Sequence, residues 1–168
     1  MESELENILI TSYKDQMILF LKSNPQYFDE AIKLAISDNQ PFAWRSAWLL
    51  WSCMEENDKR IKKHIKSIVK SITTKKDGHQ RELLKILYNL EIEEKYEGIL
   101  FGTCLNIWEE INKSPSVRFT ALKFILKIIK NHPELLEEIV FLMQDHYLES
   151  LSPGIKRSIE RMMKDATH

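Results

Sequence analysis

Residues 114–129 read SPSVRFTALKFILKII, and this stretch contains the signals that decide the fold. Ser114 followed by Pro115 is typical of a helix start, because a serine side chain caps the first turn and a proline there gives up an N–H group that has no helical partner. The apolar residues from Val117 to Ile129 then cover most of a helix circumference and leave one narrow polar stripe. The pattern predicts a helix that is packed between neighbours.

Helix starts of the same kind recur along the chain at a nearly constant interval. All five prolines precede a stretch of helical apolar periodicity, and acidic or serine caps mark further starts. The starts that would open the first helix of a pair are Ser3, Gln40, Asp77, Ser114 and Ser152, with spacings of 37, 37, 37 and 38 residues. Second helices are predicted near Asn24, Asp58, Glu93 and His132. A constant period of this size is typical of helical repeat proteins.

We therefore predict an all-α chain that forms an α-α superhelix of about four helix pairs plus a C-terminal capping helix. The expected number of helices is eight to ten, without any strand, in a single domain over residues 1–168. The last segment supports the cap, because its apolar strip is narrow and charged residues surround it.

The phrase from Ser114 to Ala121 resembles the start of a HEAT repeat, whose first helix commonly reads Val-Arg, two residues, then Ala. Weaker echoes occur around Arg45 and Arg81. The chain is similar to HEAT-repeat-like α-solenoids, including a group of small bacterial HEAT-like proteins. The resemblance implies pairing of those arginines with Asp38 and Asp77 from the loops, and a concave face lined by second helices.

The composition indicates which cellular compartment and which classes of binding partner suit the chain. The chain has 24 Lys+Arg against 25 Asp+Glu, so its net charge of −1 gives no global attraction to nucleic acid or anionic lipid. Cys53 and Cys104 lie in apolar helical stretches and are interpreted as buried thiols in a reducing cytoplasm. The acidic N-terminus and the short apolar runs favour a soluble cytoplasmic protein without membrane insertion.

The sequence lacks the local signatures of common catalytic and metal sites. It has no glycine-rich phosphate loop and no serine elbow, and its five histidines have no close ligand spacing. A thiol site made of Cys104, His146 and Asp145 is conceivable, but buried structural cysteines are the simpler interpretation. We expect a chain that is not an enzyme and has no metal and no cofactor.

Two other patterns are interpreted as structural. Trp44, Trp48 and Trp51 recur at i, i+4 and i+7, which places them on one helical stripe. Such a stripe is usually core, so we expect it to pack against the next helix pair, with a partly exposed aromatic patch as the alternative. Gly98 and Gly102 interrupt a helical stretch, and a close approach of another helix would explain them.

The run from Lys59 to Lys76 is the strongest functional signal, because it contains eight cationic residues and no acid. Five of its lysines fall within an arc of about 100° on a helix, opposite an isoleucine face. The binding residues predicted on this basis are Lys59, Lys62, Lys63, Lys66 and Lys70. An ordinary solvated face, neutralised by Glu93, Glu94 and Glu97, is the alternative.

Three functions remain open at this point. The first is a non-enzymatic interaction or scaffold module that binds a protein or peptide on its concave face, with an acidic partner as one candidate. The second is a nucleic-acid-associated protein of the HEAT-like DNA alkylation-repair type, which is less favoured because only one helix is strongly cationic. The third is assembly through exposed solenoid ends.

Replacement of Ile125 by alanine tests the predicted core. We expect Ile125→Ala to lower the free energy of unfolding by about 2 to 5 kcal/mol, because it empties a site on the most apolar helix. Urea denaturation of the wild type and the variant measures this change, with Lys123→Ala on the polar stripe as the control. A change below the measurement error would show that this helix is not part of the core.

Overall fold

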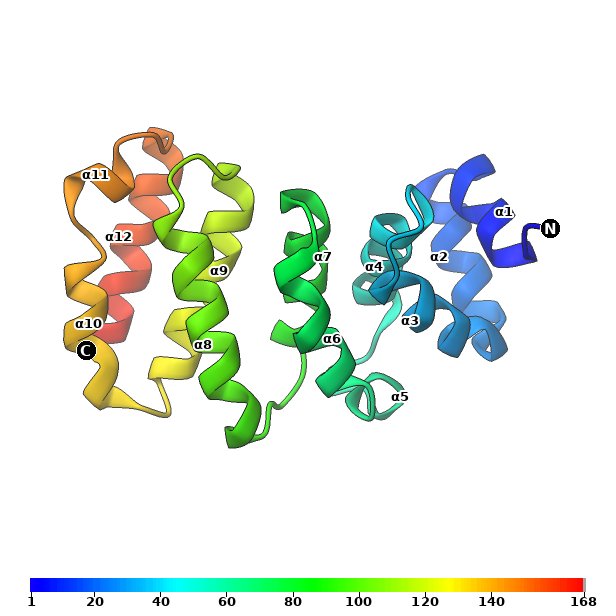
Figure 1. The fold of residues 1–168 in the computed structure, drawn as a ribbon, viewed down its shortest axis with the longest axis horizontal. Helices are drawn as coiled ribbons and strands as arrows, with labels where there is room; N and C mark the ends of the chain where they lie inside the picture. The colour runs from blue at the N-terminus through cyan, green and yellow to red at the C-terminus, as the bar shows by residue number, and fades with distance from the viewer. Residues whose placement is uncertain (168) are drawn as a thin grey trace. The chain divides into compact units, whose positions relative to one another are not determined.

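All regular structure in the computed structural model, which describes residues 1–167, is helical (Figure 1). His168, one of the five histidines considered above, lies outside the described residues. Twelve α-helices and three short 3-10 helices occur in residues 1–167, and this range contains no strand. The all-α prediction is confirmed, whereas the expected eight to ten helices was too low.

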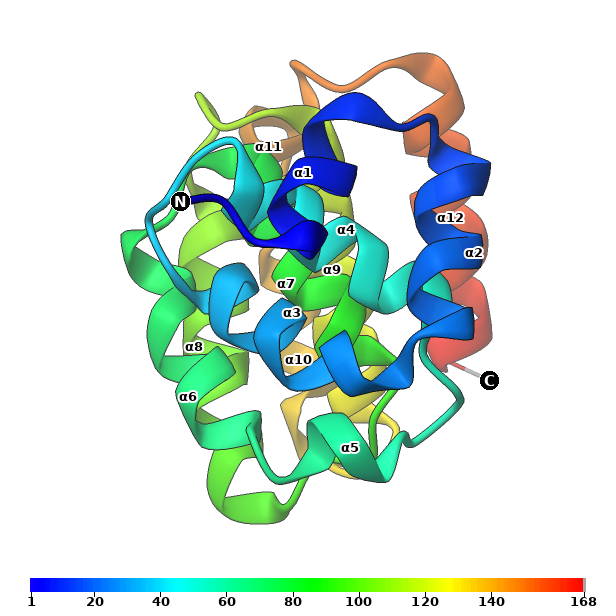
Figure 2. The same ribbon diagram turned by 90° about the vertical axis from the view of Figure 1, so that its right-hand side faces the viewer.

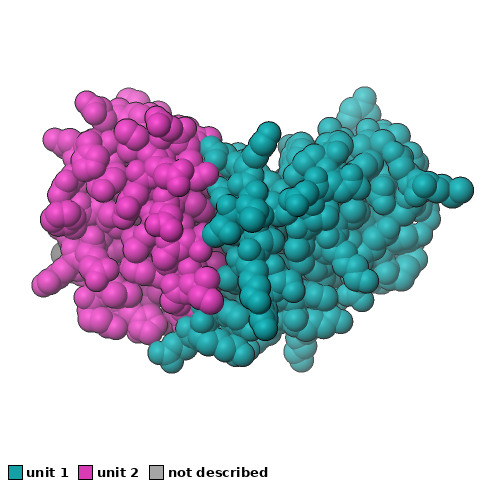
Figure 3. Space-filling view, viewed as in Figure 1, with its two compact units in different colours: residues 1–96 teal, residues 97–168 magenta. Residues whose placement is uncertain are grey.

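The chain divides into two compact units, Met1–Tyr96 and Glu97–His168 (Figure 3). Unit 1 contains α1 (Glu4–Thr11), α2 (Lys14–Ser23), η1 (Pro25–Tyr27), α3 (Phe28–Ile36), α4 (Phe42–Cys53), α5 (Lys59–Lys62), α6 (Ile65–Ser71), η2 (Ile72–Thr74) and α7 (Asp77–Tyr88). Helix α8 (Glu94–Glu109) begins in unit 1 and continues in unit 2, which also contains α9 (Pro115–Ile129), η3 (Pro133–Leu135), α10 (Leu136–Phe141), α11 (Asp145–Leu148) and α12 (Pro153–Thr167). The prediction of a single domain over residues 1–168 stays a prediction.

The five predicted first-helix starts agree with the structure. Helices α1, α4, α7, α9 and α12 each begin within two residues of the predicted position. The Ser3 hydroxyl accepts a hydrogen bond from the Glu6 N–H at 3.1 Å, and the Ser114 hydroxyl accepts one from the Val117 N–H at 3.4 Å. Pro41 is the N-cap of α4 and Pro115 is the first residue of α9, so no helix runs unbroken through either proline.

The additional helices arise because three predicted helices are interrupted. One break lies at Tyr13, whose backbone N–H donates to the Gln16 side chain and so begins a new helix, α2. Another lies between α5 and α6, where the His64 N–H bonds to the Ile61 carbonyl in a tighter turn at 2.8 Å. The third separates α10 from α11. Local capping thus divides segments that their apolar periodicity alone would make continuous.

The core of unit 1 is centred on α4, which packs against α1, α2, α3 and α7 (Figure 1). The Ser46 hydroxyl donates to the Ala31 carbonyl of α3 at 2.7 Å, which fixes the side of α4 that faces α3. Arg45 donates to the Leu9 carbonyl of α1 at 2.9 Å. The predicted pairing of Arg45 with Asp38 is therefore wrong, because Asp38 forms its ion pair with Lys75 at 2.5 Å.

The core of unit 2 contains a fully buried arginine. Arg118 on α9 donates to the carbonyl oxygens of Trp108 at 2.9 Å and Tyr147 at 2.6 Å, and its guanidinium lies over the Trp108 ring. The Trp108 indole in turn donates to the Leu142 carbonyl at 3.0 Å. Burial lowers the pKa of Arg118. The arginine of the HEAT-like phrase thus binds main-chain carbonyls in place of an aspartate, and holds α8, α9 and α11 together.

The expected close approach at Gly98 and Gly102 is wrong. A Cβ atom added at either position would meet no atom within 4 Å other than the glycine's own chain neighbours and helix backbone. Both glycines lie inside α8, where glycine costs roughly 1 kcal/mol relative to alanine because of its backbone freedom in the unfolded chain.

Alanine at these positions should therefore stabilise the protein. We expect Gly98→Ala and Gly102→Ala each to raise the free energy of unfolding by about 0.5 to 1 kcal/mol. Chemical denaturation followed by circular dichroism measures the change. A loss of stability at either position would mean that a neighbouring group occupies the space beside the glycine.

Candidate functional site

The predicted binding lysines lie on α5, on α6 and at the junction between these helices. We call Lys59, Lys62, Lys63, Lys66 and Lys70 the basic segment. Lys59, Lys63, Lys66 and Lys70 are exposed and Lys62 is half-buried. Ile61, Ile65, Ile68 and Ile72 are buried, as the sequence predicted. The lysines do not lie on one continuous helix, because α5 ends at Lys62 and α6 begins at Ile65.

One carboxylate of α3 lies close to the basic segment. Asp29 contacts the Lys63 ammonium at 3.9 Å and the His64 ring at 3.8 Å. Two of the acids that were expected to neutralise the segment have partners elsewhere: Glu93 forms an ion pair with Lys95, and Glu97 contacts the His132 ring at 3.4 Å.

Two other cations of the Lys59 to Lys76 run have structural roles. Arg60 forms an ion pair at 2.7 Å with Asp58, the N-cap of α5, and lies over the Phe28 ring. This contact holds the pKa of Asp58 below its ordinary value, mainly through the Arg60 hydrogen bond. Lys75 is buried and paired with Asp38. The exposed cations of the run are therefore Lys59, Lys63, Lys66 and Lys70 of the basic segment, together with Lys76.

Another feature of unit 1 is a groove of about 710 Å³ between α1, α2, α4 and α7. We call it the tryptophan groove, because Trp44, Trp48 and Trp51 of α4 all line it. Leu9, Ile10 and Met17 add aliphatic surface from α1 and α2. Its volume lies within the range typical of ligand sites in proteins.

The tryptophans are half-buried or exposed, and not core. Trp44 is 38% exposed, and Trp48 and Trp51 are intermediate. Trp51 does contact the next helix pair, because its indole bonds to Glu82 of α7, but the stripe as a whole is not buried there. The alternative of a partly exposed aromatic patch is confirmed by the exposure of these side chains. The reason is the position of the tryptophans on α4. Ser46 faces α3, and the tryptophans lie roughly 140–200° around the helix from Ser46, on the opposite side of α4.

Each tryptophan of the groove lies under a cation. The Lys14 ammonium is 5.4 Å from the Trp48 ring, the Lys85 ammonium is 4.6 Å from the Trp51 ring, and the Arg45 guanidinium is 5.6 Å from the Trp44 ring. A cation over an indole face is attracted by the negative face of the ring. The groove therefore combines an aromatic wall with positive charge.

One carboxylate lies in the wall of the groove and is already engaged. Glu82 on α7 is buried, accepts a hydrogen bond from the Trp51 indole and forms an ion pair with Arg81 at 2.9 Å. These contacts fix the Trp51 ring in place. The sequence offered only the tryptophan stripe as an alternative aromatic patch, because the other residues of the groove come from three further helices. The buried Ala43, Ala47 and Leu50 are a signal that α4 can make its core contact without the tryptophans.

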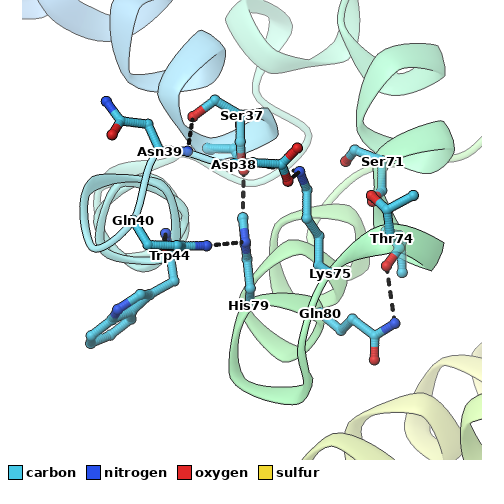
Figure 4. Close-up of polar contacts among 12 residues, drawn as sticks. Ser37, Asp38, Asn39, Gln40, Trp44, Ser71, Thr74, Lys75, His79 and Gln80 are labelled. Atoms are coloured by element: carbon cyan, nitrogen blue, oxygen red, sulfur yellow. Dashed lines mark hydrogen bonds and ion pairs between the residues drawn. The ribbon is translucent and has the colours of Figure 1, made fainter.

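Beside the groove, a polar network joins α7 to the loop after α3 (Figure 4). His79 is buried, and its Nε2 bonds to the Ala35 carbonyl at 2.6 Å while its Nδ1 faces the Gln40 side-chain nitrogen at 3.0 Å. A neutral ring with the proton on Nε2 satisfies both contacts. Figure 4 shows the Trp44 indole pointing away from this network. His79 is thus a structural histidine.

The other chemically reactive groups give no sign of a catalytic or metal centre in the described residues. Cys53 and Cys104 are buried free thiols, as predicted, and burial raises the pKa of both, which disfavours the reactive thiolate. Within residues 1–167, no group of three or more His, Cys, Asp or Glu side chains is arranged to hold a metal ion. No helix in this range is long and apolar enough to span a membrane.

The burial of His79 predicts a pH dependence of stability. Desolvation is the largest cause that lowers the pKa of His79 below its ordinary value of 6.5, and Lys75 lowers it further. The unfolded chain therefore binds a proton just below pH 6.5 that the folded chain does not, so stability is lost as the pH falls through this range.

We expect His79→Gln, which keeps the hydrogen-bonding capacity but does not titrate, to flatten this part of the profile. Urea denaturation across the pH range measures the slope. His146→Gln is the matched control, because His146 is exposed. An equal slope in the wild type and the His79 variant would contradict the assignment.

The comparisons with known proteins agree with the helix-pair architecture. The model of the HEAT repeat domain family matches residues 1–166, nearly the whole chain. Neither the search of curated proteins nor the search of solved structures gave a match. The recurring helix starts, the all-α units and this match together show that the chain belongs to the HEAT repeat domain family.

Proposed function

We propose that this protein is an interaction module that binds an acidic segment of a partner polypeptide through the basic segment of unit 1. HEAT repeats generally act as protein-interaction scaffolds, and the family is typically non-enzymatic. The observation that carries the proposal is that four of the five lysines of the basic segment are exposed, while the isoleucines of α5 and α6 are buried. The basic segment lies on the second helix of its pair, and the family resemblance implies that second helices line a concave face.

Charge supports a polypeptide partner over nucleic acid. The net charge of −1 provides no long-range attraction to a polyanion, and Asp29 lies beside the segment. Nucleic-acid binding, the alternative, would give a steep loss of affinity with salt, since each neutralised phosphate releases a counterion. The proposed place of action is the cytoplasm, where Cys53 and Cys104 would stay reduced.

Charge reversal within the basic segment tests the proposal. We expect Lys63→Glu combined with Lys66→Glu to abolish retention of the partner polypeptide, because two attractive charges become repulsive. The free energy of unfolding should change by no more than about 0.5 kcal/mol, since both side chains are exposed. Affinity capture from the native cell with quantitative mass spectrometry measures retention, and thermal denaturation measures stability.

Lys130→Glu combined with Lys164→Glu is the matched control, because it reverses two exposed lysines of unit 2. If both double variants retain the same polypeptides as the wild type, the basic segment is an ordinary solvated face. If nuclease treatment removes every polypeptide whose retention depends on Lys63 and Lys66, the direct partner is nucleic acid and the proposal is wrong.

A further inference from the structure

Among the residues that the structure describes, the charged side chains and the indole groups of the tryptophan groove include several unpaired hydrogen-bond donors, but no unpaired acceptor. Lys14 and Lys85 form no ion pair with any carboxylate of residues 1–167, and each lies over an indole ring. Within the same described range, the indole N–H groups of Trp44 and Trp48 donate to no acceptor. The one carboxylate in the wall, Glu82, is occupied by Arg81 and Trp51. A ligand that matches this surface must bring acceptors and negative charge.

The rest of the wall selects for an apolar group in the same ligand. Leu9, Ile10 and Met17 line the groove, and Tyr13 at its edge is 83% exposed. Aromatic side chains that are half-buried around a hollow are the usual anchors of protein interfaces. Because aliphatic and aromatic surface lies beside the cations, the ligand combines an apolar anchor with flanking anionic groups.

The groove differs in location from the basic segment. Helices α5 and α6 pack against α3, whereas the groove is lined by α1, α2, α4 and α7. Helix α4 lies between α2 and α6 in both views of the ribbon (Figures 1 and 2). A ligand in the groove therefore does not compete directly for the lysines of the basic segment.

We propose that the tryptophan groove is a second binding site, which takes an acidic peptide segment with a single aromatic or large aliphatic anchor residue. The anchor inserts between Trp48 and the α1–α2 wall, and the flanking carboxylates bind Lys14, Lys85 and the free indole N–H groups. Charge complementarity selects this occupant. A polypeptide fits better than a nucleic-acid strand, because two unpaired lysines at one hollow do not form the continuous cationic track that a phosphate backbone follows.

Intrinsic fluorescence gives a direct readout of occupancy. Three of the four tryptophans line the groove, and the fourth, Trp108, is fully buried in unit 2. The probe is a short synthetic peptide with a central phenylalanine flanked by aspartates. Control peptides replace the phenylalanine by alanine or the aspartates by asparagine. A single-stranded oligothymidylate tests nucleic acid. Titration of the full chain should show a saturable change in tryptophan emission with the first peptide.

The protein variants separate this site from the basic segment. Lys14→Gln combined with Lys85→Gln should weaken binding of the acidic peptide by about tenfold or more. The matched control, Lys63→Gln combined with Lys66→Gln, neutralises two lysines elsewhere in unit 1 and should leave this affinity unchanged. Trp44→Ala should also weaken binding at least several-fold. Because the Trp44 side chain is exposed, we expect the variant to stay folded, which circular dichroism checks.

Each outcome decides the inference separately from the proposed function. If binding of the acidic peptide depends on Lys14 and Lys85 but not on Lys63 and Lys66, the groove is supported, whether or not the basic segment binds a partner. The reverse dependence overturns the groove and leaves the proposed function intact. Equal binding of the alanine control peptide, binding of oligothymidylate in preference to the peptide, or absence of any emission change overturns the inference.

Discussion

The backbone carbonyls in the last turn of a helix have no partner within that helix, and this protein satisfies several of them with side chains of a later helix. Arg45 on α4 donates to Leu9 at the end of α1, and Arg118 on α9 donates to Trp108 at the end of α8. His79 on α7 contacts Ala35 at the end of α3. A short helix that ends inside the protein would otherwise leave buried acceptors unpaired, which costs about 1 to 3 kcal/mol for each group.

These contacts show how Arg45 joins two helix pairs through a main-chain carbonyl, without the Asp38 partner that the family resemblance implied. A main-chain carbonyl accepts a guanidinium hydrogen bond as an aspartate does, but it carries no net charge. Arg118 is consequently buried without a counter-ion, and lies over the Trp108 ring, whose negative face offsets part of the cost. The arginine position is thus retained, but its partner changes from an aspartate side chain to a backbone carbonyl in the last turn of a neighbouring helix.

The same packing determines which surfaces are left for partners. Helix α4 uses one side for α3 and turns its tryptophans toward the ends of α1 and α2 and toward α7, where they line a hollow. The break between α1 and α2 places Tyr13 and Lys14 at the edge of that hollow. On α5 and α6, the isoleucines take the buried side and the lysines are left to solvent. Both candidate surfaces are therefore the sides of helices that remain exposed after each helix has buried one apolar side against its neighbours.

The sequence by itself determined the helix starts, the all-α class and the burial pattern of α5, α6 and α9, because capping residues and apolar periodicity act within a few residues of one another. It could not decide the side of α4 that is covered. Helix α4 has two apolar sides: one carries Ala43, Ala47 and Leu50, and the other carries the tryptophan stripe. Because α3 packs against the side with the smaller residues, Trp44, Trp48 and Trp51 are left at the groove. Nor could it find the partners of Arg45, His79 and Arg118, since the carbonyls they bind are main-chain atoms that no residue type identifies. Tertiary structure alone brings Lys14 and Lys85, which are far apart in the chain, to the same aromatic wall.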